Sequence, residues 1–341
     1  MDKAEILDLL RSRGTYVSGQ EICDTFGVSR TAVWKAVEQL KKEGHAIEAV
    51  RNRGYLLAEE TGDVYGREEL LSRLETVRIG REAEYYDSID STNRRAKQLA
   101  EDAAEGGHDG ALIFADRQTA GRGRRGRSWE SPAGKNIYFS LLLRPQMAPE
   151  QAPMLTLLMA LAVVRGLRAL GAELGISVDD PQLQPRIKWP NDIVLGDRKI
   201  CGMLTEMGAE QGYIHYVVIG VGINVKKQDF VGELSTKATD IETKWDTLIP
   251  RCRLIAHILK AFEELYEAAC KVGDLRGLRE EFDCCMVNLG HSVRVLDPAG
   301  EYDGIARGIN DKGELLVERE DGSATAVYAG EVSVRGIYGY V

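Results

Sequence analysis

Apolar positions in the first 57 residues recur at the three- and four-residue spacing of short helices. The apolar face of the first helix is formed by Ile6, Leu7, Leu9 and Leu10. Ser18 to Glu21 has the form of a capping box, which predicts a second helix that ends near Gly27. Ser29 then caps a third helix, whose apolar stripe is formed by Val33, Val37 and Leu40. The pattern predicts three helices in a row.

Two short apolar runs, 46–50 and 55–57, follow the third helix. The polar segment 51–54 between them contains asparagine and glycine, which suit a tight turn, so we expect a β-hairpin with a basic tip. A helix, a helix-turn-helix and a hairpin together make a winged helix-turn-helix. We therefore predict such a domain over residues 1–60.

A polar linker at 59–63 precedes a larger domain, predicted over residues 66–285. Its expected strands are 111–115, 137–143, 186–188, 193–195, 214–219 and 223–225. Its expected helices are 67–75, 92–104, 151–171 and 251–271. Helices and strands alternate without a regular βαβ repeat, which favours a mixed sheet.

Over residues 288–341 the sequence changes to short apolar runs separated by turn residues, and we predict that this segment forms a third domain. The short strands expected there are 291–296, 301–309, 314–318 and 324–328. Turn sequences rich in Asp, Asn and Gly separate them, which indicates a small antiparallel β-barrel. The whole chain is thus predicted to be an α+β protein of several domains.

Composition narrows the possible functions. The net charge is −9 over 341 residues, so the chain does not coat nucleic acid through its overall charge. Six cysteines occur without a CxxC pair, which indicates free thiols and a cytoplasmic location. We find neither a signal peptide nor a segment of membrane-spanning length, and expect no membrane contact.

An arginine-glycine segment is the most distinctive candidate for chemistry. Gly121 to Gly126 matches GxGxxG, but the apolar run 137–143 that follows reads as a strand, which excludes a dinucleotide fold. Five arginines and no acid lie from Arg117 to Arg127, and such a loop requires an anion. A nucleotide or acyl phosphate fits this requirement. A solvated basic loop or a nucleic-acid contact is the alternative.

Four other polar segments accompany this loop, and each has a plain structural alternative. The segment 88–93 precedes a helix and can cap it or bind a small polar ligand. The segment 188–192 places a cation, an amide and a carboxylate around a proline turn, which suits phosphate and magnesium but is also an ordinary turn. The segments 198–202 and 220–225 add a cation and glycines that permit close approach.

In their order and wording, these segments resemble the biotin protein ligase family. They read SIDSTN at 88–93, GRGRRGRSW at 121–129, KWPND at 188–192, RKICG at 198–202 and GVGINV at 220–225. The winged helix resembles the bifunctional branch of the family, the biotin operon repressors. The resemblance covers nearly the whole chain, and implies a class II synthetase-like catalytic domain and an SH3-like C-terminal β-barrel.

The resemblance implies an enzyme that is also a repressor. Biotin would react with Mg-ATP to give biotinyl-5'-adenylate, and biotin would then pass to a lysine of the biotin carboxyl carrier protein of acetyl-CoA carboxylase. The adenylate-bound protein would form a homodimer and bind biotin operator DNA. The alternatives are a biotin-sensing repressor without ligase activity, and a ligase for another carboxylic acid such as lipoate.

The resemblance also implies the site residues. The biotin site would comprise Ser91, Thr92, Asn93, Gln118, Gly121, Arg122, Arg124, Lys199, Gly202 and Gly222. ATP and the adenylate would contact Arg124, Arg127, Trp129, Lys188, Asn191, Asp192 and Asn224. The catalytic groups would be Arg124, Lys188, Asp192 and Lys199. Asp192 could bind Mg²⁺, orient a lysine or help deprotonate the acceptor amine. Trp245 could stack on adenine, but an anchoring role is favoured.

Helical spacing places several polar and basic residues opposite the apolar stripe of the third helix. With its cap and the predicted wing, the expected DNA-binding set is Ser29, Arg30, Thr31, Trp34, Lys35, Arg51 and Arg53. Residues 1–57 carry nine Lys/Arg against eight Asp/Glu, a net charge of only +1. A winged helix used for protein contacts is therefore the alternative to DNA binding.

Overall fold

The computed structural model describes residues 2–58, 62–102, 107–177, 180–210, 212–297, 300–328 and 333–336. Chain contacts divide it into two compact units. The N-terminal unit comprises Met1–Glu75 and Pro250–Ala256, and the larger unit comprises Thr76–Ile249 and His257–Val341.

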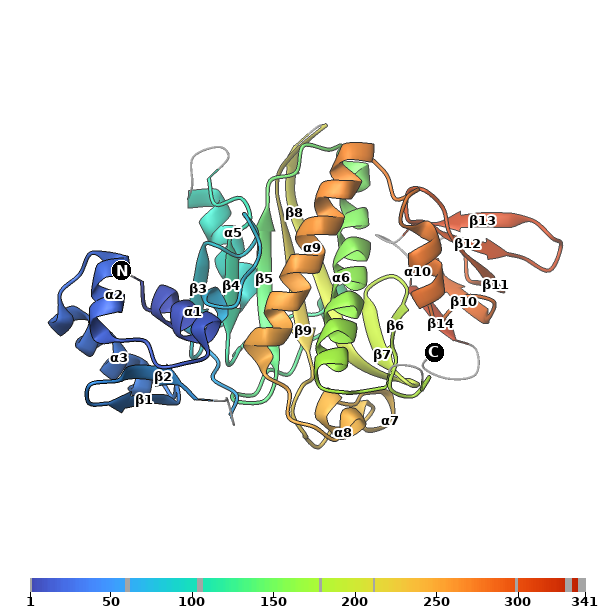
Figure 1. Ribbon diagram of the computed structural model, residues 1–341. Coiled ribbons are helices and arrows are strands. Elements are labelled where there is room, and N and C mark those ends of the chain that lie inside the picture. Colours follow the sequence, from blue (N-terminus) through green and yellow to red (C-terminus); the bar gives the residue numbers. More distant parts are fainter. Residues whose placement is uncertain are drawn as a thin grey trace. The chain divides into compact units, whose positions relative to one another are not determined.

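The N-terminal unit contains the predicted winged helix-turn-helix (Figure 1). Its elements are α1 (Lys3–Arg13), α2 (Gly19–Phe26), α3 (Arg30–Lys42), β1 (Ile47–Val50), β2 (Gly54–Leu57) and α4 (Arg67–Leu71). Both serine caps are confirmed, because Ser18 Oγ accepts from the Glu21 N–H at 3.0 Å and Ser29 Oγ accepts from the Ala32 N–H at 3.3 Å. The Glu21 carboxylate of the expected capping box pairs instead with Arg13 at 2.9 Å. Strands β1 and β2 pair antiparallel. The α-helix expected over 67–75 ends at Leu71.

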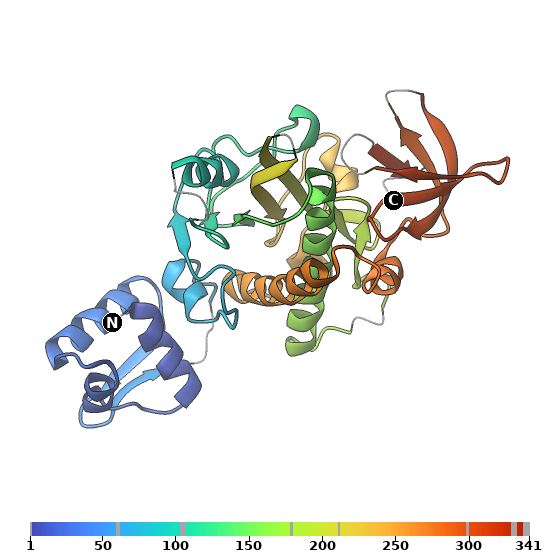
Figure 2. The same ribbon diagram turned by 90° about the horizontal axis from the view of Figure 1, so that it is seen from above.

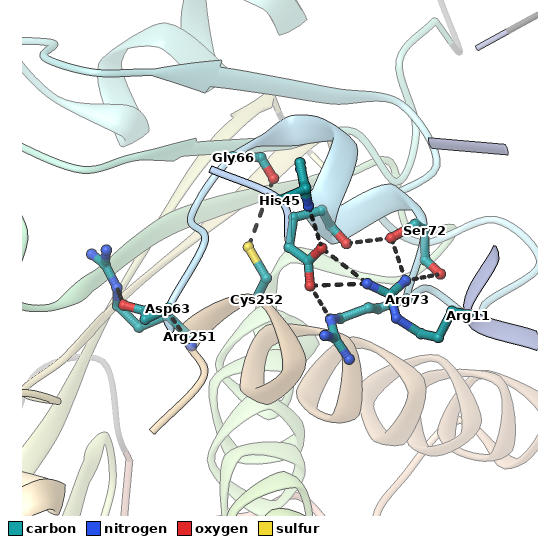
Figure 3. Close-up of polar contacts among 9 residues, drawn as sticks. Arg11, His45, Asp63, Gly66, Ser72, Arg73, Arg251 and Cys252 are labelled. Atoms are coloured by element: carbon teal, nitrogen blue, oxygen red, sulfur yellow. Dashed lines mark hydrogen bonds and ion pairs between the residues drawn. The ribbon is translucent and has the colours of Figure 1, made fainter. Parts of the chain in front are cut away.

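A buried carboxylate fastens α4 to the winged helix. Glu69 on α4 accepts from Arg11 on α1 at 3.0 Å and pairs with Arg73. The Nδ1 atom of His45, which is also buried, is 3.5 Å from the same carboxylate. Arg11 also donates to the hydroxyl of Ser72 at 2.7 Å (Figure 3). Helix α4 is therefore a structural part of this unit.

The larger unit is built on a seven-stranded mixed sheet. Its strands are β3 (Ala83–Tyr86), β4 (Leu112–Ala115), β5 (Ile137–Leu143), β6 (Pro185–Lys188), β7 (Asp192–Leu195), β8 (Arg198–Glu210) and β9 (Tyr213–Ile223). The order is β3-β4-β5-β9-β8-β7-β6, and only β3 and β4 pair parallel. The separate strands expected at 214–219 and 223–225 are wrong, since one strand runs to Ile223. Strands β3 and β8 were not predicted.

Helices cover both faces of this sheet. Their bounds are α5 (Thr92–Asp102), α6 (Ala152–Glu173), α7 (Leu234–Lys237), α8 (Ile241–Trp245), α9 (Arg251–Val272) and α10 (Arg279–Cys285). Helix α5 packs on β4, β5 and β9, and the opposite face carries α6 with α9 beside it (Figure 2). Gly166 permits the α6–α9 contact, because a Cβ there would lie 2.6 Å from Ile258.

Helix α6 corrects one expectation from the sequence. The segment Pro149–Glu173 is long and apolar enough to cross a membrane by length and composition, with a mean hydropathy of 1.7. In the folded chain, 83% of its most apolar window is buried within the structure. This apolar character is accounted for by packing against the sheet and α9.

The C-terminal segment forms a small antiparallel sheet. Its strands are β10 (Ser292–Leu296), β11 (Tyr302–Ile309), β12 (Leu315–Glu318), β13 (Ala324–Val327) and β14 (Ser333–Gly336). They are ordered β13-β12-β11-β10-β14, and β14 was not predicted. Among the described residues, the outer strands β13 and β14 do not pair with each other, so a closed barrel stays a prediction.

Candidate active site

Three glycines on adjacent strands form the floor of the site. Gly202 on β8 lies opposite Gly222 on β9, and Gly220 lies two residues along β9 on the same face. A Cβ at Gly220 would fall 2.1 Å from Asn93 Oδ1, and one at Gly222 would fall 2.6 Å from the Trp129 ring. Glycine is therefore required where the start of α5 and the arginine loop approach the sheet.

A hydrogen-bonded network at the start of α5 forms one wall. The Asn93 amide donates to Glu206 at 2.9 Å and to the Leu204 carbonyl at 3.3 Å. Gln118 Oε1 accepts from the backbone N–H of Thr92 at 2.9 Å. These polar side chains are held by internal partners before any ligand arrives.

The arginine loop is a short hairpin in this structure. Arg122 and Ser128 form an antiparallel bridge, and the Trp129 N–H donates to the Gly121 carbonyl at 2.9 Å. Arg125 at its tip has a φ of 56°, in the left-handed region. The hairpin presents several guanidinium groups beside the glycine floor.

Cationic side chains converge at the base of the loop. Arg124 donates to Asn191 Oδ1 at 2.9 Å, and Lys199 pairs with Asp192 at 2.6 Å. Burial lowers the pKa of Arg124 and Arg125 adds to this effect, while the charge of Asp192 opposes it. An anion bound here would offset the desolvation of the Arg124 guanidinium.

Two cavities adjoin at these cations. The smaller, about 60 Å³, is lined by Thr92, Asn93 and Gln118 among others, and the larger, about 980 Å³, by Lys188 and Asp192 among others. Residues that line both are Gly123, Arg124, Trp129, Asn191 and Lys199. The two cavities therefore meet beside Arg124 and Lys199.

Comparisons with known proteins agree with this architecture. Residues 85–224 match the biotin/lipoate A/B protein ligase family, residues 3–56 an HTH domain, and residues 289–335 the biotin protein ligase C-terminal domain. The bifunctional ligase/repressor BirA of Bacillus subtilis is 38% identical over 97% of this chain and 98% of its own length. BirA of Escherichia coli is 31% identical over 96% of this chain and 95% of its own length.

The chain belongs to the BirA family of bifunctional ligase/repressors. A structural comparison agrees with this assignment. The biotin protein ligase of Aquifex aeolicus, solved in complex with biotin and ATP, has a TM-score of 0.63 and 28% identity. The similarity covers 75% of this chain and 99% of that one.

Most residues assigned from the resemblance to this family lie around the two cavities. The smaller cavity is lined by Ser91, Thr92, Asn93, Gln118, Arg122, Arg124, Lys199, Gly202 and Gly222. The larger is lined by Arg124, Arg127, Trp129, Lys188, Asn191, Asp192 and Asn224. Gly121 lines neither; a Cβ there would lie 2.4 Å from the Trp129 carbonyl, so this glycine lets the loop ends meet.

Some features of a BirA-family site were not predicted. Ser140, which is fully buried, and Glu206 hold the start of α5, and a lone polar residue inside the apolar run 137–143 was the available signal for Ser140. Within the described part of the chain, the buried indole N–H of Trp129 has no hydrogen-bond partner. Trp245 is buried and donates to the Leu183 carbonyl at 3.0 Å, a contact that favours a structural role for its indole.

The residues predicted for the DNA-binding role of a BirA-family protein are accessible. All seven are exposed: Ser29, Arg30, Thr31, Trp34, Lys35, Arg51 and Arg53. Trp34 is 55% exposed, so its indole is accessible to a partner. Arg30 is oriented by Gln20 Oε1 at 2.8 Å, and Arg53 lies over the Tyr16 ring at 4.3 Å.

Proposed function

We propose that this protein joins biotin to a lysine of a biotin carboxyl carrier protein through biotinyl-5'-adenylate, and represses biotin genes. The observation that carries the ligase function is the pair of adjoining cavities that share Arg124 and Lys199. We assign biotin to the smaller, polar-walled cavity, which would have to widen to admit it, and ATP to the larger, basic one. The biotin carboxylate and the α-phosphate would then meet beside two cations.

The proposed chemistry has two steps. In the first, a biotin carboxylate oxygen attacks the α-phosphorus of ATP and pyrophosphate leaves. Arg124, Lys188 and Lys199 stabilise the negative charge that develops, so positioning and electrostatics supply most of the catalysis. In the second, the neutral amine of the carrier lysine attacks the mixed anhydride and AMP leaves. Arg124 would also retain the adenylate until the carrier arrives.

The contact between Asp192 and Lys199 favours one of the three roles considered for Asp192. Its carboxylate is 2.6 Å from Lys199 Nζ, which supports an orienting role. Asp192→Asn should therefore slow adenylate formation, measured as biotin-dependent pyrophosphate release. Full rates in both half-reactions would remove Asp192 from the mechanism.

Magnesium would enter the site with ATP. Within the described ranges, no group of three or more acidic, histidine or cysteine side chains could hold a metal ion. Mg²⁺ is commonly held by one or two carboxylates together with substrate phosphates and water. Asp192 could supply one such carboxylate, and bound Mg²⁺ would neutralise charge on the triphosphate.

Regulation would use the N-terminal unit. We propose that the arginine loop orders further over the adenylate, that the closed protein forms a homodimer, and that two winged helices then match a two-fold operator. Equal rates of proteolysis within 117–129 with and without biotin plus ATP would count against this coupling. We also propose that the C-terminal sheet closes as an SH3-like barrel that helps receive the carrier, and that the protein acts in the cytoplasm.

The deciding experiment uses the purified protein with biotin, Mg-ATP and a biotin carrier domain. We expect intact mass spectrometry to show covalent biotin on the carrier, and only when ATP is present. Binding of biotin without any mass shift would favour a sensor that lacks ligase activity. Transfer of lipoate in place of biotin would favour the other alternative.

A further inference from the structure

Glu206 on β8 was not among the site residues predicted from the sequence. It contacts Asn93, which lines the smaller cavity. Its carboxylate accepts from the Asn93 amide at 2.9 Å and from Lys97 on α5 at 2.7 Å, and Arg122 is 3.8 Å away. Partial burial raises the pKa of Glu206, but hydrogen bonds from Lys97 and Asn93 and the charges of Lys97 and Arg122 together lower it. Glu206 is therefore an anion at neutral pH, and an anion can only accept hydrogen bonds.

This acceptor sets the orientation of Asn93. Both partners of the Asn93 amide nitrogen, the Glu206 carboxylate and the Leu204 carbonyl, are acceptors only. The other end of the amide, Oδ1, must then face Ser140 Oγ at 2.6 Å. The reversed orientation would place an oxygen against two acceptors, which is strongly unfavourable for a buried amide.

The order of protons continues from Asn93 to Thr92. Ser140 has one hydroxyl proton, and Asn93 Oδ1 takes it because this oxygen has none to donate. Thr92 Oγ1 lies 2.8 Å from Ser140 Oγ and 3.1 Å from Gln118 Oε1. Ser140 is placed to donate to Thr92, but its one proton goes to Asn93, and Thr92 donates its own proton to Gln118 Oε1. The Thr92 hydroxyl therefore keeps its lone pairs for the cavity.

The opposite end of the network agrees with this order. Ser131 donates to the Trp129 carbonyl at 3.0 Å, so its oxygen accepts from Gln118 Nε2 at 3.1 Å. Gln118 Oε1 is then directed at the Thr92 backbone N–H. Gln118 Oε1 thus accepts both the N–H and the hydroxyl proton of Thr92.

We infer that Glu206 is a positioning residue for substrate recognition: through Asn93 and Ser140 it makes the Thr92 hydroxyl an acceptor for an N–H group of the ligand. A cyclic urea carries such a group. A dithiolane ring does not, so the same order favours biotin over lipoate. The inference rests on the proposed function, because the smaller cavity must hold biotin.

The test is Glu206→Gln in the full-length protein. The two oxygens of Glu206 accept separately from Asn93 and Lys97. A glutamine has one oxygen for both; when that oxygen faces Lys97, the Leu204 carbonyl alone keeps Asn93 in its orientation. We expect the KM for biotin to rise roughly tenfold, the change produced by about one net hydrogen bond, with kcat within about twofold. An unchanged KM in a protein whose wild type ligates biotin would overturn the inference alone; a wild type that neither binds nor ligates biotin would overturn the proposed function.

Two control variants separate recognition from simple anchoring of α5. Lys97→Met breaks the Lys97–Glu206 ion pair but leaves the Asn93 contact. Glu84→Gln weakens the tie between Arg95 on α5 and β3. We expect both to bind biotin like the wild type. A KM increase in either that equals that of Glu206→Gln would show that Glu206 only anchors the helix.

A second measurement probes hydrogen-bond polarity directly. Competition binding would compare biotin with a cyclic carbamate analogue, in which a ring oxygen replaces the urea N–H that faces Thr92. The wild type should prefer biotin by roughly tenfold, and Glu206→Gln should lose most of this preference. An equal preference in both proteins, or a wild type that does not discriminate, would contradict the inference even if the variant were less stable.

Discussion

At the scale of single residues, the site depends on positions of β9 that carry no side chain. Gly220 and Gly222 lie on the face of β9 that carries α5, and the space above them is occupied by Asn93 and Trp129. Asn93 cannot move aside without cost, since its amide uses three internal partners. The two glycines therefore form the surface against which Asn93 and Trp129 pack.

Gly220→Ala tests this arrangement. Its Cβ would lie 2.1 Å from Asn93 Oδ1, and overpacking of this kind typically costs about 1–3 kcal/mol. We expect calorimetric titration to show biotin affinity reduced about tenfold or more. Gly277→Ala is the matched control, because a Cβ there meets nothing within 4 Å, and it should bind biotin normally. Equal affinity in all three proteins would show that the floor can relax.

The sequence predicted those site residues whose type alone indicates a chemical role. An arginine-rich loop without acids and the cation-amide-carboxylate turn at 188–192 can be recognised from residue types. Ser140 and Glu206 could not be found in this way. Their role follows from the pairing of Ser140 with Gly220 and of Glu206 with Val218, which places both on the α5 face. The register between strands cannot be predicted from the local sequence.

At the scale of elements, Glu263 ties α9 to the chain that leads into β3. Its carboxylate, which is buried, accepts from three consecutive backbone N–H groups, of Val77, Arg78 and Ile79, at 2.7 to 2.8 Å. Burial raises the pKa of Glu263, but these N–H groups and Arg78 outweigh that effect and lower it. The contact thus stabilises the fold while the carboxylate is ionised.

Glu263→Gln should destabilise the larger unit by roughly 1–3 kcal/mol at pH 7, because the acceptor loses its charge and an NH2 group replaces one of its two oxygens. Because the folded pKa lies below the usual 4.5, this contribution is complete above the unfolded pKa and disappears as pH falls through the folded value. Urea unfolding of wild type and variant at pH 7 and pH 3 measures the loss of stability and its dependence on pH. A constant difference between wild type and variant at the two pH values would contradict the assignment.

Glu69 is the corresponding link within the N-terminal unit. Glu69→Gln would leave Arg11 and Arg73 without their shared anion, and removing one partner of a buried ion pair typically costs about 3 kcal/mol or more. We expect the N-terminal unit of the variant to unfold at a lower temperature than that of the wild type, as measured by calorimetry. Glu68→Gln, which removes a partly exposed carboxylate that pairs with Lys3 at 3.3 Å, should cost much less. Similar losses in both variants would argue against the Glu69 cluster.

Element types followed from the sequence where local signals were strong. Serine caps defined α2 and α3, and the apolar run 137–143 is β5 as predicted. Strand β8 was missed because it contains the polar motif at 198–202 and outer residues that alternate irregularly. Strand β9 seemed to end before Gly220, since glycines resemble turn residues until their partners Asn93 and Trp129 are known.

At the scale of the whole molecule, DNA binding has to occur against an unfavourable overall charge. The chain has a net charge of −9, whereas residues 1–57 carry +1, so attraction to phosphate depends on a few local cations. Arg30 is pre-oriented by Gln20 at the start of α3, where recognition helices contact base edges. Lys35 is exposed one turn later.

Arg30→Ala together with Lys35→Ala should therefore abolish operator binding at physiological salt and leave biotin ligation unchanged. Arg13→Ala with Lys42→Ala removes the same charge from other exposed positions of the N-terminal unit and should weaken binding much less. Fluorescence anisotropy against salt separates the contributions, because each lost phosphate contact lowers the slope of log K against log salt by about 0.9. Equal losses in both double variants would mean that binding follows net charge alone, and full binding by the first would favour a winged helix used for protein contacts.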